Sequence, residues 1–392
     1  MGLLAFAIDY RWPLIFYGTI ILLIVLLRRK LEWQGFGMGI YRTRVGLRLM
    51  EQWGARYRGI IIVLGYVGIG VGFVGMALIL WSLAQGVWRF LTDITAPPVV
   101  TPVIPGFSVP GFGLEVPLIT GWIALFALLI IHEFSHGVVS RAHRIPVKSS
   151  GLLVFGPIAG AFVEPDEKRV GREHETVQYA LSAAGPFSNI LTAGIAALIV
   201  AIAIAPLTAM VTVPDGVTVK TVVPGYPASF AGLPEGAVIA SVDGVPVGDR
   251  EALGTHMEGV APGSVVTLGT DRGEYVLATV ENPDDPASSY LGVTIEDHSG
   301  PRMAGLLGSA LASVMLWIGL FFGWFILLSL GIGLANLLPI GPLDGGRMFR
   351  LAAEQVTGSR KRGDWWWRIT SKVTLVVLAG LLLFPLVRWF AT

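Results

Sequence analysis

Long uncharged blocks of apolar residues constrain the fold of this chain more than any other feature. Blocks of spanning length lie at 60–84, 116–139, 177–210, 303–338 and 373–391, with a shorter one at 12–27 that a basic run ends. A helix needs about 20 apolar residues to cross a bilayer, and we count the short block as a first span. Charged residues make up only 14% of the chain, against roughly 25% in soluble proteins. The sequence therefore predicts a polytopic α-helical membrane protein with about six transmembrane helices.

The Lys and Arg residues gather in alternate connections between these spans. Segments 28–59, 140–176 and 339–368 hold eight, six and six of them, which is 20 of the 28 in the chain. Positively charged connections face the cytoplasm. We therefore expect an integral protein of the cell membrane with both termini outside. Residues 94–117 contain no basic residue and are rich in Pro and Gly, which predicts an irregular external connection.

Residues 211–298 break the membrane pattern. Short β-rich runs alternate there with Gly, Pro and Asp turns, and the stretch holds 13 acidic and 3 basic residues. We predict three regions: a membrane region at 1–210 with four spans, an extracytoplasmic α+β domain at 211–298, and a membrane region at 299–392 with two spans. The run from Gly225 to Val247 resembles the core of a bacterial-type PDZ domain, which binds extended peptides at a sheet edge. A β-rich module that only supports the membrane core is the alternative, and its charge is also explained by adaptation to high salt.

The third predicted span ends in the sequence His-Glu-Phe-Ser-His at 132–136. His132 and His136 are four residues apart, so both project from one face of a helix and can reach one zinc ion. Glu133 stands beside them to activate a water molecule as general base. Ionisable residues inside a span are functional more often than structural, so we favour this interpretation over a histidine pair that serves helix packing.

A hydrolytic zinc site needs a third protein ligand and leaves a position for water. The chain has no cysteine, which restricts the ligands to His, Asp or Glu. Glu164 and Glu173 are near in sequence but sit in a charged run typical of a solvated loop. Asp344 follows the fifth span at the predicted cytoplasmic face, at the depth where the third span ends. We therefore favour Asp344 as the third ligand.

The two motifs together resemble the site-2 protease family of intramembrane zinc metalloproteases. The resemblance rests on His-Glu-Phe-Ser-His and on the run Asn336-Leu-Leu-Pro-Ile-Gly-Pro-Leu-Asp-Gly-Gly346, separated by the PDZ-like insert. It implies that Asp344 is the third zinc ligand and that Asn336 contacts the substrate near the metal. It also implies a membrane-dipping β-hairpin at 151–163 that aligns an unwound substrate, where an ordinary buried loop remains the alternative. The run Ala-Gly-Pro-Phe-Ser-Asn at 184–189 resembles a further family motif, and for Ser188 and Asn189 small-residue packing competes with a direct catalytic role.

The expected function is therefore that of a zinc metalloendopeptidase, with one Zn²⁺ per chain, in regulated intramembrane proteolysis. Its expected partners are membrane proteins with a transmembrane helix, the lipid bilayer, and peptide termini at the PDZ-like domain, and no nucleic acid. A non-catalytic membrane receptor that binds peptides through this domain is the main alternative. A metal transporter is less consistent with the sequence, because transporters spread polar residues over several spans and three spans here contain no charged residue.

Overall fold

The computed structural model describes residues 7–35, 37–93, 96–109, 111–112, 114–283 and 285–391 of the chain. Within these residues, six helices are long and apolar enough to cross a membrane. Their bounds are α2 (Arg11–Leu27), α4 (Arg58–Thr92), α5 (Leu118–Ala142), α7 (Glu175–Ile199), α11 (Leu306–Asn336) and α13 (Arg360–Ala391). The predicted fold class is thus confirmed, and the short first block forms one of the six helices that are long and apolar enough to span. The chain divides into a membrane unit, residues 1–199 and 320–392, and an inserted unit, residues 200–319.

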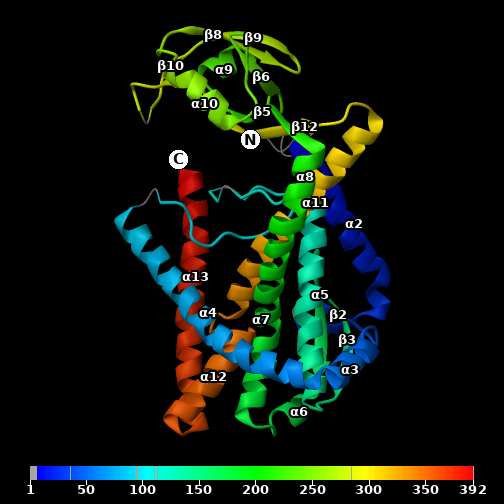
Figure 1. Cartoon of the computed structure of the whole chain (residues 1–392). Helices are drawn as coiled ribbons and strands as arrows, with labels where there is room; N and C mark the ends of the chain where they lie inside the picture. The colour runs from blue at the N-terminus through cyan, green and yellow to red at the C-terminus, as the bar shows by residue number, and fades with distance from the viewer. Residues whose placement is uncertain are drawn as a thin grey trace. The chain divides into compact units, whose positions relative to one another are not determined.

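Helix α7 occupies a central position in the membrane unit, where it contacts α4, α5 and α12 (Asp344–Thr357) (Figure 1). Buried side chains from three of these helices form one apolar cluster, which includes Met76, Ala183 and Met348. A second cluster joins α5 to α11 through Leu128 and Phe325. The packing of α7 against its neighbours therefore fixes how the third span and the segment after the fifth span meet.

Glycines allow α4 to pack closely against these partners. Gly65, Gly68, Gly72 and Gly75 are all buried along this helix. A Cβ atom at Gly72 would lie 2.8 Å from the side chain of Met348, and one at Gly75 would lie 2.5 Å from Leu337. Small residues at such spacing let helices approach in a membrane, where burial of apolar surface does not drive association.

A small antiparallel sheet belongs to the same unit, with strand order β1-β2-β3-β4. Its strands are β1 (Glu32–Gln34), β2 (Met38–Thr43), β3 (Val147–Phe155) and β4 (Ile158–Pro165). Residues 151–163, for which the sequence left a hairpin and a buried loop open, belong to a hairpin formed by β3 and β4. Strands β1 and β2 were not predicted from the sequence. Strand β4 contacts α5, which brings the sheet to the helix that carries the two histidines.

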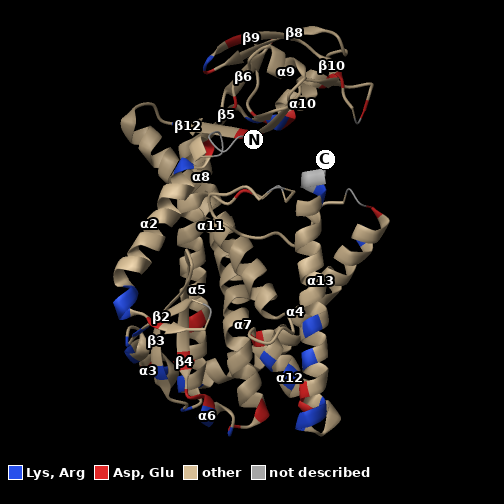
Figure 2. Cartoon of the chain, turned by 180° about the vertical axis from the view of Figure 1, so that it is seen from behind, with Lys and Arg blue, Asp and Glu red and all other residues tan. Residues whose placement is uncertain are grey.

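Short helices complete the membrane unit. They are the 3-10 turn Arg28–Lys30, α3 (Leu47–Arg56) and α6 (Glu167–Val170). The connection 94–117 is irregular where it is described, with one bridge between Ser108 and Glu115. Lys and Arg residues gather at the end of the unit that carries α3, α6 and α12 (Figure 2).

The inserted unit begins with a π-helical turn at Val200–Ile204 and α8 (Ala205–Val211), which continue directly from α7. Its main sheet has the path β12-β5-β6-β8-β9, with β7 paired to β6. The elements are β5 (Thr212–Val222), α9 (Pro227–Phe230), β6 (Val238–Val242), β7 (Val245–Pro246), α10 (Arg250–Glu258), β8 (Val265–Thr270), β9 (Gly273–Ala278), β10 (Val280–Glu281), β11 (Ser289–Tyr290) and β12 (Val293–Pro301).

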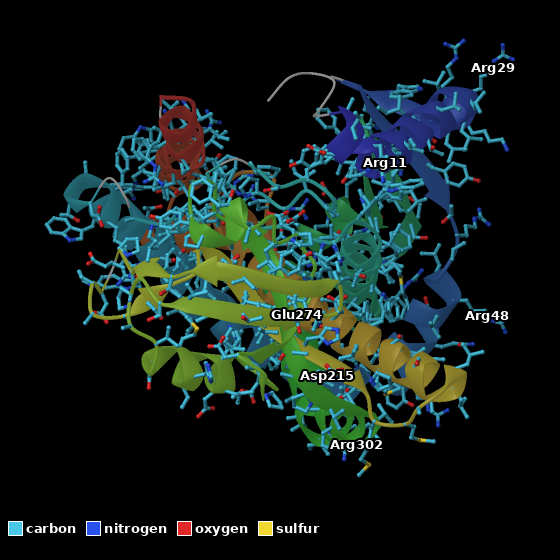
Figure 3. All side chains as sticks on the ribbon, turned by 90° about the horizontal axis from the view of Figure 1, so that it is seen from above. Arg11, Arg29, Arg48, Asp215, Glu274 and Arg302 are labelled. Carbon is cyan, nitrogen blue, oxygen red and sulfur yellow. The ribbon has the colours of Figure 1, made fainter. Side chains whose placement is uncertain are left out.

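The inserted unit has its own buried core, which includes Val217, Ile239, Leu253 and Leu268. Helix α9 begins at the Pro227-Ala228 pair, and β6 ends at Val242, one residue before Asp243, whose φ of 51° starts an Asp-Gly turn. Acidic side chains such as Asp215 and Glu274 lie at its surface (Figure 3). The predicted α+β insertion is thus a folded unit.

Candidate metal centre

Helix α5 carries His132 and His136 one turn apart, and their ring centroids are 5.0 Å from each other. The helix is apolar on both sides of them, so the two imidazoles lie inside the membrane unit, with His132 only 4% exposed. His136 precedes the last residue of α5 by six positions, which corresponds to about 9 Å along the helix. His132 is therefore buried and His136 partly buried, and both lie near the end of the span where the basic connections gather.

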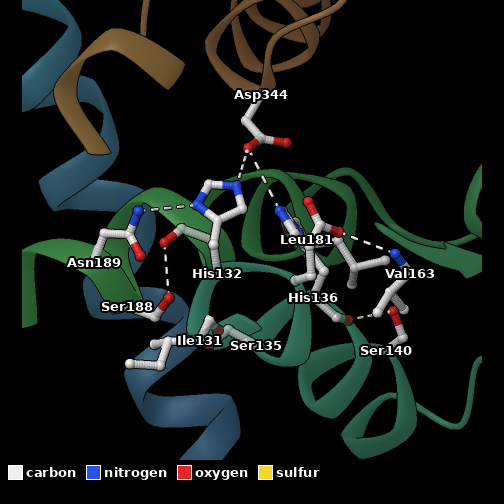
Figure 4. Close-up of polar contacts among 12 residues, drawn as sticks. Ile131, His132, Ser135, His136, Ser140, Val163, Leu181, Ser188, Asn189 and Asp344 are labelled. Atoms are coloured by element: carbon white, nitrogen blue, oxygen red, sulfur yellow. Dashed lines mark hydrogen bonds and ion pairs between the residues drawn. The ribbon is translucent and has the colours of Figure 1, made fainter. Parts of the chain in front are cut away.

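Asp344 is the first residue of α12. Its Oδ2 atom lies 3.2 Å from Nε2 of His132 and 3.4 Å from Nε2 of His136 (Figure 4). The first turn of a helix favours a negative charge, because its backbone N–H groups point toward that end. Within the described residues, these three side chains are the one group of His, Asp and Glu whose ligand atoms converge, all within 4.8 Å of one another.

The rings of both histidines are held from their far side by α7. Nδ1–H of His136 donates to the backbone oxygen of Leu181 at 2.8 Å. Nδ1 of His132 lies 3.2 Å from the amide nitrogen of Asn189, a fully buried side chain. Each histidine consequently directs its Nε2 atom toward Asp344 (Figure 4). A partner on the second nitrogen is the usual arrangement for a histidine that binds a metal.

The three donor atoms fit a zinc ion. Tetrahedral zinc with bonds of 2.0–2.1 Å separates its ligand atoms by about 3.3–3.4 Å, close to the two distances to Asp344. Space beside the donors is kept open by Gly185 on α7. A Cβ atom there would lie 2.3 Å from Nε2 of His132 and 2.5 Å from Nε2 of His136. Two imidazoles, one carboxylate and a glycine cradle are thus compatible with a three-ligand metal site.

A cavity of about 610 Å³ opens onto these ligands. Glu133 and Asn336 also line it. The carboxylate of Glu133 accepts a hydrogen bond of 3.0 Å from the backbone N–H of Val163 on β4. The cavity therefore joins the three candidate ligands, the candidate base, and the residue expected to contact substrate.

The two nearer carboxylates considered as ligands lie elsewhere. Glu164 accepts a hydrogen bond from Ser149 at 2.7 Å and pairs with Arg42. The hydrogen bond from Ser149, with the charge of Arg42, holds the pKa of Glu164 below its usual value. Glu173 pairs with Arg169 at 3.0 Å. Neither belongs to the convergent group, which leaves Asp344 as the carboxylate beside the histidines.

Three contacts at the site could not be assigned from the sequence. Gly185 and Asn189 belong to the Ala-Gly-Pro-Phe-Ser-Asn run, which drew attention to this helix without defining a role. Their position against the two rings follows from the rotation of α7 relative to α5. The contact of Val163 with Glu133 depends on the register of the hairpin, and no sequence signal indicated it.

Comparison with known proteins agrees with this geometry. The sequence model of peptidase family M50 matches residues 120–380, a range that contains both motifs. An uncharacterized protein of Methanocaldococcus jannaschii, MJ0971, is 27% identical over 353 residues, which cover 88% of this chain and 86% of that protein. The zinc metalloprotease RasP of Shouchella clausii is 30% identical over 179 residues, covering 34% of this chain and 41% of RasP. This chain therefore belongs to peptidase family M50, the site-2 protease family of intramembrane metalloproteases.

Proposed function

We propose that this chain is a zinc endopeptidase that cuts peptide bonds within or next to the transmembrane segments of other membrane proteins. The observation that carries the proposal is the convergence of His132, His136 and Asp344 on one point inside the membrane unit. A carboxylate that is not part of this trio, Glu133, lines the same cavity. This combination supplies the ligands and the base that metal-assisted hydrolysis requires. Regulated intramembrane proteolysis is the process such an activity would serve.

The roles of the residues follow from their positions. His132, His136 and Asp344 would hold zinc, which when bound lowers the pKa of a water from about 16 to near 7 and polarises the scissile carbonyl. The carboxylate of Glu133 takes a proton from the attacking water and delivers it to the leaving amine. Asn336, at the end of α11, has a side chain able to hold the substrate backbone or the developing oxyanion.

The substrate has to be unwound before it is cut, because each peptide bond in a helix is shielded by the turns around it. Strand β4 is the last strand in the order of its sheet, so no described strand pairs with its outer edge. An extended substrate segment can add to such an edge through backbone hydrogen bonds. The bond from Val163 to Glu133 supports this assignment, since it places the edge of β4 directly beside the base.

The distribution of charge supports a definite orientation. The connections around α3, α6 and α12 carry most of the Lys and Arg residues. Positively charged connections remain in the cytoplasm. We therefore place the termini and the inserted unit outside the cytoplasm, and the metal ligands near the cytoplasmic face of the cell membrane.

The inserted unit is proposed to act as a PDZ-like filter that admits substrates already shortened outside the membrane. Its local pattern of a Pro-Ala helix, a strand and an Asp-Gly turn supports this interpretation. Removal of residues 211–298 should then let full-length substrates be cut faster. If full-length substrates are cut no faster without them, the unit only supports the membrane core.

The proposal is tested by a cleavage assay in liposomes with a labelled single-span substrate. We compare the native protein with Glu133→Gln and with the control Glu51→Gln, whose carboxylate is 57% exposed on the surface and pairs with Arg141. Loss of a general base costs about 10²–10⁴-fold in rate, so Glu133→Gln should be nearly inactive while still binding zinc. The control should cut at the native rate, because exposed ion pairs contribute little.

Two results would contradict the proposal. The first is that native protein with bound zinc cuts none of a broad panel of spanning segments, which would favour a receptor that binds peptides without cutting them. The second is that Glu133→Gln cuts as fast as the native protein. In that case proteolysis would stand, but Glu133 would not be the base.

A further inference from the structure

Asn189 is the buried polar residue whose role the proposed mechanism leaves unexplained. It lies on α7, has no exposed surface, and directs its amide nitrogen to Nδ1 of His132 at 3.2 Å. Its amide oxygen has no hydrogen-bond partner among the described residues. A buried amide with an unpaired end is costly, so packing alone does not explain why an amide stands at this position.

The backbone and Cβ atom of Asn189 already make the contacts that helix packing requires. Its backbone oxygen accepts a hydrogen bond of 3.0 Å from Ser329 on α11. A Cβ atom on Gly333 of the same helix would lie 3.2 Å from the Cβ of Asn189, so the two helices are close there. Alanine at position 189 would preserve both features. The amide adds only its contact with His132.

The role of this contact depends on which ring nitrogen of His132 carries the proton. A neutral imidazole carries one proton, and a metal ligand needs Nε2 bare, with the proton on Nδ1. Nδ1–H then needs an acceptor on the side away from the metal. For His136 that acceptor is the backbone oxygen of Leu181. For His132 the neighbour is the amide of Asn189, which offers an acceptor when its oxygen faces the ring.

The same amide also suits the ring without a metal. In the arrangement described here, the amide nitrogen donates to Nδ1 of His132, and Nε2–H donates to Asp344 at 3.2 Å. A half-turn of the amide exchanges its nitrogen and oxygen with almost no change of shape. Asn189 can therefore serve both protonation patterns of His132, whereas a backbone carbonyl can only accept.

We propose that Asn189 is a positioning residue for the metal site: its amide oxygen accepts the Nδ1 proton of His132 and so presents Nε2 to the zinc ion. This inference rests on the proposed zinc site. It gives the Ala-Gly-Pro-Phe-Ser-Asn run two functions on one helix face, because Gly185 keeps space for the metal and Asn189, one turn later, orients a ligand. Asn189 acts through His132 and contacts neither substrate nor metal.

The test measures zinc affinity of the full-length protein in detergent, by competition with a chelator of known affinity. Three variants are compared with the native protein. Asn189→Leu keeps the branched shape but removes the amide, Asn189→Ala removes the side chain, and Asn189→Asp keeps an oxygen acceptor. The control is Thr192→Ala on the same helix, whose hydroxyl donates to the backbone oxygens of Ser188 and Asn189. Visible absorption of the cobalt-substituted forms reports the ligand geometry independently of activity.

The expected result is a zinc Kd that rises roughly 10–100-fold in Asn189→Leu and Asn189→Ala, the usual cost of losing a partner behind a metal ligand. Asn189→Asp should restore affinity toward the native value, and Thr192→Ala should match it. The cobalt spectrum should change in the Leu and Ala variants and be retained in the Asp variant. Circular dichroism of the metal-free forms separates this loss from unfolding, and the rescue by Asp does so as well.

The inference is overturned if folded Asn189→Leu and Asn189→Ala bind zinc with native affinity, or if Asn189→Asp binds as weakly as they do. Either result would leave the native zinc site, and hence the proposed function, intact. A native protein that binds no zinc would instead overturn both proposals together. Zinc binding by the native protein therefore shows whether only the role of Asn189 is wrong or the zinc site as well.

Discussion

The carboxylate of Asp344 lies 3.2 Å from Nε2 of His132, although 212 positions separate the two residues in the sequence. Two spans, α7 and α11, and the inserted unit lie between them along the chain. They meet because α7 contacts both α5 and α12, so the metal site depends on how α7 packs. Changes on α7 should therefore affect metal binding although this helix supplies none of the three ligands.

Gly185→Ala should remove metal binding without unfolding the protein. The added methyl group would lie 2.3 Å from Nε2 of His132 and 2.5 Å from Nε2 of His136, so the ligands have to move apart. We expect zinc content and cleavage to fall together, while circular dichroism remains that of a helical protein. The matched control is Gly194→Ala on the same helix, where a Cβ atom meets nothing within 4 Å. If Gly185→Ala binds one zinc and cuts normally, the proposed cradle is wrong.

Removal of the metal should abolish cleavage reversibly. Two imidazoles and a carboxylate form a donor set typical of catalytic zinc, whereas magnesium prefers oxygen ligands and retains waters. Protein treated with a chelator and then dialysed should be inactive, and stoichiometric zinc should restore it where magnesium does not. Full activity after zinc has been removed to below a tenth of the protein concentration would be incompatible with a zinc mechanism.

Gly75→Val should destabilise the membrane unit. A Cβ atom at this position would lie 2.5 Å from Leu337, which is completely buried beside Asn336. Overpacking of this kind typically costs about 1–3 kcal/mol, so the thermal midpoint in detergent should fall. Gly70→Val is the control on the same helix, because a Cβ atom there has no neighbour within 4 Å. Equal midpoints for the two variants would show that the close approach of α4 does not matter for stability.

The proposed orientation can be tested with single cysteines, because the chain contains none of its own. Val356 is 88% exposed at the end of α12, and Ser229 is exposed in the inserted unit. In intact cells, a reagent that cannot cross membranes should label Ser229→Cys but not Val356→Cys. After the cells are opened, both should react. Labelling of both residues, or of Val356→Cys alone, in intact cells would contradict the orientation.

The sequence predicted the parts of the site that local spacing determines. His132 and His136 share a helix face because they are four residues apart, and apolar residues on both sides place them within a span. Asp344 could be proposed because alternate connections lie on the same side of a membrane. The end of the fifth span, which Asp344 follows, is therefore expected at the same depth as the end of the third span. The six spans and the α+β insertion could be predicted because each is a long segment of distinctive composition. An error of a few residues at the end of such a segment does not change its assignment.

The remaining features depend on packing that one sequence does not specify. The contacts of Gly185 and Asn189 with the two rings require a particular rotation of α7 about its axis. Several faces of this helix are apolar enough to pack against α5, so the sequence does not select one. Strand β1 has only three residues, all exposed, so it has no alternating pattern to detect. The bond between Val163 and Glu133 needs the register of the hairpin, because a shift by one residue would direct a different group toward α5.

The most direct test of the account compares Asp344→Ala with the native protein, by measuring zinc per chain and cleavage of a spanning substrate on the same liposome samples. Glu173→Ala is the control, since this carboxylate is nearer to the histidines in sequence but pairs with Arg169. We predict one zinc and full activity for the native protein and the control. For Asp344→Ala we predict a loss of affinity beyond the roughly 10–100-fold expected for an outer partner, with no detectable cleavage. Native zinc content and native cleavage in Asp344→Ala would contradict the assignment of the metal centre.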